Sequence, residues 1–371
     1  MFDTYKIDMQ TLNFGLIATQ LPVPDMVKIG IAAEKYGFDS VWVPDHYVDI
    51  PPSGDMVDPW VVLSAIASHT KKIMLSTAAT DVLRYHPSKL AHIVATLDQL
   101  SHGRAMVGIG AGEVMNVVPF GIKWEKSSER ILRVRETIEV MKMLWSSSID
   151  RRVNYKGKYY MLENALLDLS PLQKPQPKVF VAALASKTLL AVAGEVGDGW
   201  LSGYTTIEKF REMAKIVKSA ASLANRDPDS IRLAAWIPII LSKDRRTLEM
   251  ARNAVAPEVL LCARKMLKDY GIEIPNEIFG DSNIPYSHII PNKEIAYLAT
   301  KFAHNIPAEL IEEFVACGDH ANVTEFLDKY RKEGATDIIL RDVVGLMVKK
   351  NVDAVRVTLR EFSKKVIPHF R

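Results

Sequence analysis

A regular alternation of short apolar runs with helical stretches constrains the fold of this chain more than any other feature. Eight segments typical of buried strands cover residues 12–18, 39–46, 72–80, 104–112, 177–185, 198–203, 230–242 and 335–343. The stretches between them, such as 25–38 and 86–101, space their apolar residues at helical intervals. Eight strands alternating with helices predict an α/β fold, a parallel (β/α)8 TIM barrel. A doubly wound sheet would need a glycine-rich turn after its first strand, which 15–25 lacks.

Two stretches predict additions to this barrel. Residues 153–162 contain tyrosines around a Lys-Gly turn, which indicates a small hairpin. Residues 270–306 lie between the seventh and eighth strands and are rich in Pro, Asn and Ile with little periodicity. Because structureless loops of that length are uncommon unless they are functional, we expect an ordered insertion over one end of the barrel. We therefore expect one domain over 1–371.

Composition excludes several classes of protein. The chain of 371 residues is 48% hydrophobic and 25% charged, with a net charge of +3 and no basic stripe that would indicate nucleic acid. Cys262 and Cys317 lie far apart without a CxxC motif, which disfavours a disulfide scaffold or a metal site and favours a reducing cytoplasm. No apolar run is long enough to span a bilayer, and residues 1–10 do not look like a signal peptide.

Polar and small residues follow several of the predicted strands, at the end of a barrel where enzymes place their chemistry. Asp45 and His46 end the second strand, and small or hydroxylated residues (76–81) end the third. The fourth strand ends in glycines that leave room for a planar ring, and Glu113 and Asn116 follow them. These positions predict a cleft with His46 and Glu113 as a proton-transfer pair.

Residues 182–187 connect the fifth strand to a helix. The free amides and dipole of a helix N-terminus favour a phosphate, so an anion pocket is one interpretation of this stretch. Each feature has a simpler alternative: Asp45 as a helix cap, glycines that serve only turns, Glu113 as a surface carboxylate, and 182–187 as an ordinary helix start. Their coincidence at successive strand ends favours the functional interpretation.

Longer motifs resemble a known family. Residues 41–47 (VWVPDHY), 97–121 (LDQLSHGRAMVGIGAGEVMNVVPFG), 179–200 (VFVAALASKTLLAVAGEVGDGW) and 314–340 (FVACGDHANVTEFLDKYRKEGATDIIL) resemble the bacterial-luciferase-like superfamily. They are most similar to its branch that uses the deazaflavin coenzyme F420. That branch includes methylenetetrahydromethanopterin reductases, glucose-6-phosphate dehydrogenases, secondary alcohol dehydrogenases and phthiodiolone ketoreductases. The resemblance implies an oxidoreductase that transfers a hydride between F420 and a small organic substrate.

The resemblance also implies roles for individual residues. His46 would be an acid or base near the substrate, and Glu113 a proton donor or relay. A non-prolyl cis peptide at Thr77–Ala78 would support the deazaflavin ring. The residues implied to contact the coenzyme ring or its phosphate are Asp45, Thr77, Ala78, Thr80, Gly112, Asn116, Ala183, Leu184, Ala185 and Ser186.

Departures from the branch narrow the substrate. Residues 45–52 (DHYVDIPP) lack the DHF-x-P-W pattern of relatives that oxidise sugar phosphates or alcohols, and 202–206 (SGYTT) lacks their lysine. Glu312 and Glu313 stand where a basic residue aligns, and 184–187 (LASK) replaces a Gly-Gly-Pro type turn. Glucose 6-phosphate is therefore disfavoured, while methylenetetrahydromethanopterin and a ketone/alcohol pair stay open. An FMN-dependent monooxygenase and a non-catalytic coenzyme-binding relative are the alternatives.

The resemblance further implies a homodimer, formed through helices near the first four strands. Within the sequence, only the apolar content of 59–67 and 88–97 supports such an interface. We expect neither nucleic acid nor membrane as a partner.

Overall fold

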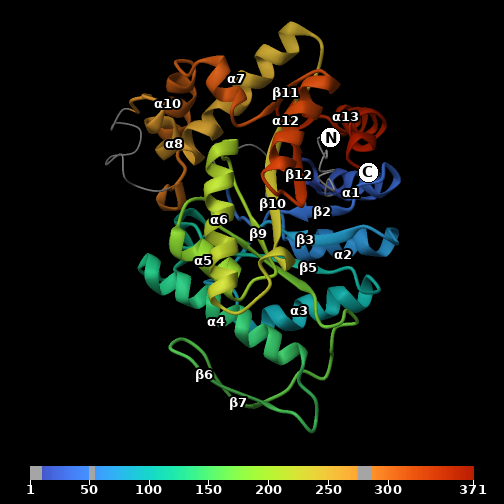
Figure 1. The fold of residues 1–371 in the computed structure, drawn as a ribbon, viewed down its shortest axis with the longest axis vertical. Coiled ribbons are helices and arrows are strands. Elements are labelled where there is room, and N and C mark those ends of the chain that lie inside the picture. The colour runs from blue at the N-terminus through green and yellow to red at the C-terminus, as the bar shows by residue number, and fades with distance from the viewer. Residues whose placement is uncertain (1–10, 50–54, 275–285) are drawn as a thin grey trace, which may run out of the picture.

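A parallel sheet rolled into a barrel forms the centre of the molecule (Figure 1). The computed structural model describes residues 11–49, 55–274 and 286–371. The eight barrel strands in chain order are β1 (Asn13–Ile17), β2 (Ser40–Val43), β3 (Met74–Thr77), β5 (Met106–Gly110), β8 (Lys178–Ala182), β9 (Gly199–Leu201), β10 (Arg232–Leu241) and β12 (Asp337–Asp342). Each lies within one of the eight predicted segments, so the predicted barrel is confirmed.

Parallel pairing carries the sheet around the barrel in the order β3-β2-β1-β12-β10-β9-β8-β5-β4, where β4 (Thr80–Asp81) is a short strand after β3. The first and last strands in the chain are neighbours, with Leu16 of β1 opposite Leu340 of β12. A parallel bridge between Leu75 and Ala105 brings β3 beside β5. The carboxyl ends of all these strands therefore meet at one mouth.

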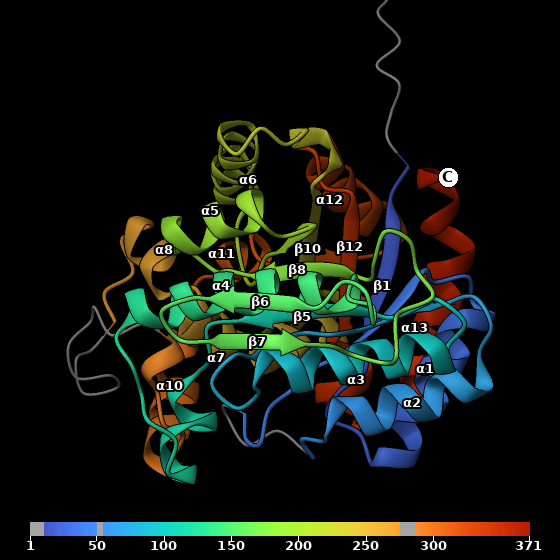
Figure 2. The ribbon, with the colours of Figure 1, turned by 90° about the horizontal axis from the view of Figure 1, so that it is seen from below.

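Helices cover the outside of the sheet (Figures 1 and 2). Asp58 caps one of them by accepting hydrogen bonds from the backbone of Trp60 and Val61, and Pro59 occupies its first position. The helices that follow the barrel strands are α1 (Val23–Lys35), α2 (Pro59–His69), α3 (Pro87–Leu100), α4 (Ser127–Trp145), α5 (Lys187–Glu195), α6 (Ile207–Leu223), α12 (His320–Lys332) and α13 (Val352–Lys365).

Two additions stand out from the repeated unit. The predicted hairpin is present as β6 (Val153–Lys156) and β7 (Met161–Ala165), which lie at the far end of the molecule from α7 in Figure 1. Between β10 and β12 the chain adds α7 (Arg245–Cys262), α8 (Arg264–Asp269), α10 (Lys293–Ala303), α11 (Ala308–Glu312) and the short strand β11 (Ala316–Gly318).

The predicted insertion at 270–306 is partly visible in this added segment. Residues 275–285 of it lie outside the described residues, and α10 lies within its described part. The added segment packs in a second apolar cluster, which includes Val259, Phe314 and Val315 and also Ile240 of β10. That the whole chain is one domain stays a prediction.

Large side chains fill the inside of the barrel beneath its mouth. Trp42 and Phe180 are fully buried there, with ring centroids 5.1 Å apart in an edge-to-face arrangement. Gly15 makes this packing possible, because a Cβ atom on it would lie 2.8 Å from the Trp42 indole nitrogen. No helix among the described residues is long and apolar enough to cross a membrane.

Candidate active site

A cavity of about 1400 Å³ lies over the carboxyl ends of the barrel strands. Residues that follow β1, β2, β5, β8 and β9 line it, as expected for the functional end of such a barrel. Ten of the twelve predicted site residues line this cavity, namely Asp45, His46, Ala78, Gly112, Glu113, Asn116, Ala183, Leu184, Ala185 and Ser186. Thr77 and Thr80 do not line it.

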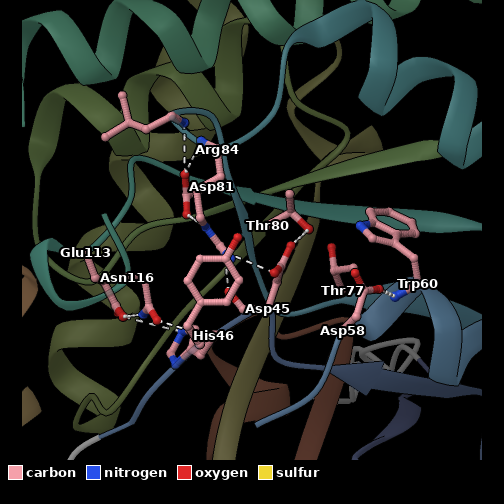
Figure 3. A network of polar contacts seen from close by, with 12 residues as sticks. Asp45, His46, Asp58, Trp60, Thr77, Thr80, Asp81, Arg84, Glu113 and Asn116 are labelled. Atoms are coloured by element: carbon pink, nitrogen blue, oxygen red, sulfur yellow. Dashed lines mark hydrogen bonds and ion pairs between the residues drawn. The ribbon is translucent and has the colours of Figure 1, made fainter. Parts of the chain in front are cut away.

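His46 and Glu113 meet on one wall of the cavity (Figure 3). The Nε2 atom of His46 lies 3.4 Å from Oε2 of Glu113. The Nδ1 atom of His46 is buried and has no hydrogen-bond partner among the described residues. Burial raises the pKa of the Glu113 carboxyl, and the neighbouring His46 opposes this rise. An imidazole beside a carboxylate in the wall of a cavity is a side chain that can act as a general acid or base.

Asn116 holds both this pair and the chain that carries it. It belongs to a 3₁₀ turn (Val114–Asn116) that follows β5. Its Nδ2 atom donates to Oε2 of Glu113 over 3.3 Å, and its Oδ1 accepts from the backbone N–H groups of Tyr47 and Val48 at 2.7 and 3.1 Å. With both ends of its amide engaged by protein, Asn116 organises the site, while its predicted contact with the coenzyme stays a prediction.

Asp45 lies behind His46 and is only 3% exposed. Its Oδ2 atom accepts a hydrogen bond of 2.8 Å from the Thr80 hydroxyl, and its Oδ1 lies 3.0 Å from Nη2 of Arg84. Burial raises the pKa of Asp45, while Arg84 and Thr80 oppose this rise. The sequence did not single out Arg84, a residue in the turn after β4 that contacts Asp45.

The predicted cis peptide is present but one residue further along. It joins Ala78 to Ala79 rather than Thr77 to Ala78, so that prediction is wrong in position. The Ala78 N–H still donates to the carbonyl oxygen of Val43 over 2.9 Å, which keeps the Thr77–Ala78 bond within the sheet. Ala78 and Ala79 both line the cavity.

Two hydroxyls predicted to contact the coenzyme have protein partners instead. Thr77 is fully buried, and its hydroxyl donates to the carbonyl oxygen of Gly108 over 2.9 Å. Gly108 permits this approach, because a Cβ atom there would lie 2.3 Å from the Thr77 carbonyl oxygen. Thr80 is also fully buried and donates to Asp45. Both residues shape the wall from behind.

Residues 183–186 line the same cavity as His46 and connect β8 to α5. Ser186 caps this helix by accepting a hydrogen bond from the Leu189 N–H over 3.3 Å. The lining of the cavity here and at the end of β5 consists largely of alanine and glycine, namely Gly110, Ala111, Gly112, Ala182, Ala183 and Ala185. Such small side chains leave room for a flat ligand close to the backbone. A phosphate near Ser186 stays a prediction.

A second polar network that sequence reasoning missed lines another part of the cavity. Arg341 of β12 pairs with Glu258 of α7, and its Nη2 lies 2.9 Å from Oε1 of that carboxylate. It also donates to Gln20 over 2.6 Å and to the Tyr204 hydroxyl over 3.0 Å. All four residues are buried. Burial and the charge of Glu258 raise the pKa of Tyr204 well above its usual value. The sequence could have indicated this network, because Gln20 and Arg341 lie near the carboxyl ends of the first and eighth strands.

The added segment supplies cationic side chains to the same cavity. Arg264, Lys265 and Lys268 of α8 line it, together with Arg130 of α4. Cys262, the last residue of α7, also lines it, and burial raises the pKa of its thiol well above the ordinary value. Periodicity alone could not indicate that α8 would reach the mouth of the barrel.

Comparison with known proteins places this site in a class. The model of the luciferase-like monooxygenase family matches residues 9–337, and the chain therefore belongs to that family. The phthiodiolone/phenolphthiodiolone dimycocerosates ketoreductase of Mycobacterium bovis (strain BCG / Pasteur 1173P2) is 30% identical over 388 aligned residues that cover 97% of each chain. The F420-dependent glucose-6-phosphate dehydrogenase of Amycolatopsis mediterranei (strain U-32) is 33% identical over 251 residues, which cover 66% of this chain and 73% of the relative.

Solved structures agree with this placement. An F420-dependent secondary alcohol dehydrogenase in complex with an F420-acetone adduct is 25% identical, with a TM-score of 0.79 over 98% of this chain and 100% of that one. The F420-dependent tetrahydromethanopterin reductase of Methanopyrus kandleri is 23% identical, with a TM-score of 0.78 over 98% and 99%, and shares the fold. The predicted membership of the luciferase-like superfamily, among relatives named as F420-dependent oxidoreductases, is confirmed.

Proposed function

We propose that this protein transfers a hydride between coenzyme F420 and a ketone/secondary alcohol pair. One observation carries the proposal: His46 lies 3.4 Å from Glu113 by its Nε2 atom and has an unpartnered Nδ1, in the wall of a cavity at the functional end of the barrel. The family membership and the names of the relatives support F420 as the coenzyme.

The lining of the cavity fits a flat coenzyme. Small residues from the ends of β3, β5 and β8 leave its walls close to the backbone, and Ser186 begins α5 beside them. Its volume of about 1400 Å³ exceeds that of an ordinary small-molecule pocket, so it has room for a coenzyme and a substrate together. When bound, F420 supplies the hydride chemistry.

The chain itself supplies the proton. In the direction of ketone reduction, the His46 imidazole would donate a proton to the substrate oxygen as that oxygen gains negative charge. Glu113 orients the imidazole through Nε2 and stabilises its protonated form, and Asn116 holds the carboxylate. General acid help of this kind contributes about two to four powers of ten in rate.

A ketone/alcohol pair is favoured by two relatives. The ketoreductase matches over nearly the whole chain, and the secondary alcohol dehydrogenase is similar over 98% of it. A methylenetetrahydromethanopterin substrate has weaker support, because the reductase structure is 23% identical and supports the fold alone.

Glucose 6-phosphate is a second candidate because of one structural observation. The absence of a lysine after the sixth strand argued against it, but Arg264, Lys265 and Lys268 reach the cavity from α8 instead. A cationic group of this kind can hold a phosphate. The substrate panel therefore includes this sugar phosphate.

The test is a spectral titration of the purified protein with F420 and with FMN, followed by an anaerobic substrate panel. We expect saturable binding of F420, and its bleaching with a secondary alcohol or its regeneration from the reduced form with a ketone. Tight binding of FMN with oxygen-dependent turnover would favour the monooxygenase alternative. Binding of F420 without turnover of any substrate would favour a non-catalytic relative.

Assembly and location stay part of this proposal. We expect a homodimer, in line with the family resemblance, and a cytoplasmic location, in line with the two separate cysteines. Sedimentation at micromolar concentration tests the assembly, and a monomer there would contradict it.

A further inference from the structure

The segment 45–48 is held in place by side chains from two other parts of the barrel. From one side, Oδ1 of Asn116 accepts from the backbone N–H of Tyr47 over 2.7 Å. From the other, Nη2 of Arg84 donates to the backbone carbonyl oxygen of Asp45. His46 lies between these two contacts (Figure 3).

These contacts act on the two peptide groups that flank the His46 Cα atom. The carbonyl of Asp45 and the N–H of His46 share one planar peptide group, and the carbonyl of His46 and the N–H of Tyr47 share the next. Arg84 holds the first plane and Asn116 the second. With both planes held, only the side-chain torsions of His46 stay free, and Glu113 engages the end of the ring.

Arg84 is suited to this task by its own surroundings. Its side chain is 3% exposed, and its Nε donates to the carboxylate of Asp81 while Nη2 reaches Oδ1 and the carbonyl oxygen of Asp45. Its guanidinium carbon lies 4.6 Å from the centroid of the Tyr47 ring. A planar fork with several donors can make these contacts at once, whereas a lysine ammonium is a single point charge.

Arg84 is not among the described residues that line the cavity, although its partners Asp45 and Asp81 are. A ligand in the cavity would therefore meet those carboxylates and not the guanidinium. Any effect of Arg84 on a reaction must then pass through the residues that it holds. A substitution of Asn116 could not distinguish an effect through His46 from a direct one, because Asn116 lines the cavity and contacts Glu113.

We propose that Arg84 is a positioning residue for His46, which sets the place of the imidazole relative to Glu113 by holding the Asp45–His46 peptide group. The proposal rests on the acid/base role of His46 proposed above. It adds a requirement of its own: a cation at position 84 is insufficient, and the hydrogen bond to the Asp45 carbonyl is needed.

Arg84→Lys separates charge from fork geometry. It keeps a cation between Asp45 and Asp81, so we expect the protein to fold and to bind F420 with a dissociation constant within about threefold of wild type. Turnover should fall by about tenfold or more, because general acid help depends on geometry. In a His46→Ala background the same substitution should cost less than about twofold, because a residue acting only through His46 has nothing further to lose. An equal loss in both backgrounds would overturn the proposal.

Arg232→Lys is the matched control. Arg232 also pairs with a buried aspartate, with its Nε 2.9 Å from Oδ2 of Asp337, but at the opposite end of the barrel. We expect this variant to change stability and to leave turnover per folded molecule within about twofold of wild type.

A second measurement needs neither coenzyme nor substrate. In protein labelled with ¹⁵N-histidine, the ring resonances of His46 can be identified by their loss in His46→Gln. We expect them to move in Arg84→Lys and to stay in place in Arg232→Lys. Unchanged His46 resonances in Arg84→Lys would overturn the proposal even if turnover fell. If the wild-type protein does not turn over F420, the proposed function is wrong. The spectroscopic test still decides whether Arg84 positions His46, because it needs no turnover.

Discussion

Carboxyl groups at the N-terminal ends of the barrel strands have full sets of donors, whereas several at the C-terminal ends do not. At the N-terminal end, Asp98 is fully buried and accepts from the backbone of Leu172 and Gln173 and from the Gln173 side chain, at 2.7, 3.0 and 2.6 Å. Three backbone N–H groups likewise lower the pKa of Glu34, although burial opposes them.

At the C-terminal end burial dominates. It raises the pKa of Asp45 and of Glu113, and that of Asp342 to about 7. The difference indicates a division of labour: satisfied carboxylates at one end stabilise the fold, whereas Asp45 and Glu113 at the other end are incompletely compensated and line the cavity. Asp342 shares the raised pKa but does not line the cavity. Four substitutions test this contrast.

Asp342→Asn should give the largest effect, and the effect should depend on pH. The Asp342 pKa rises from 3.8 to about 7 on folding, because burial outweighs the donors that favour its charge. Between those values the unfolded chain loses a proton that the folded one keeps, so the wild-type free energy of unfolding falls as pH rises. The loss is about 4 kcal/mol in total, most of it between pH 4 and pH 7 and the remainder by about pH 8. Asparagine should abolish it.

Urea unfolding of both proteins from pH 4 to pH 8 measures this difference. The free energy of unfolding of Asp342→Asn, relative to that of the wild type, should increase as pH rises. A difference in unfolding free energy that is constant over the range would contradict the assigned pKa.

Asp98→Ala should lower the free energy of unfolding by about 3 kcal/mol, because it leaves several buried N–H donors without an acceptor. Turnover per folded molecule should not change. The control is Asp25→Ala, which breaks an ion pair of 2.7 Å with the exposed Lys28 and should cost about 0.5 kcal/mol or less. Loss of turnover in folded Asp98→Ala would contradict the assignment of this end of the barrel to stability alone.

His46→Ala should lower turnover about a hundredfold or more, with F420 affinity within about threefold of wild type. The exposed His92 on α3 provides the control, and His92→Ala should keep full turnover. If His46 only packs the strand end, its removal should lower the melting temperature and leave turnover per folded molecule intact.

Glu113→Gln should have the smallest effect, about a tenfold loss of turnover, because it removes charge and keeps shape. Burial raises the Glu113 pKa, so wild-type kcat/KM should fall as pH drops through a value above the ordinary 4.5. Glutamine cannot titrate, and the variant should lack this acidic limb. A pH profile identical to that of the wild type would exclude Glu113 from the proton-transfer pair. The double variant with His46→Ala should be no worse than His46→Ala alone.

Local patterns were sufficient for the barrel and for the pair on its wall. Short apolar runs and period-3.6 stretches are properties of neighbouring residues, so they indicated each strand and helix before any contact was known. The rule that parallel strands end at one mouth then placed His46 beside Glu113. The same logic could have found Arg341, which ends the eighth strand.

Contacts between distant segments depended on how the barrel closes. Arg84 pairs with Asp45 because the turn after β4 lies against the segment that follows β2, and Glu258 reaches Arg341 because α7 folds back over the mouth. The cis peptide lies at Ala78–Ala79, directly after the last hydrogen bond between this segment and β2. Periodicity carries no information about such pairings, since each depends on two segments that only the closed barrel brings together. The chain's own pattern thus decided the scaffold and the two side chains of the proposed proton-transfer pair, and tertiary packing decided which residues hold them in place.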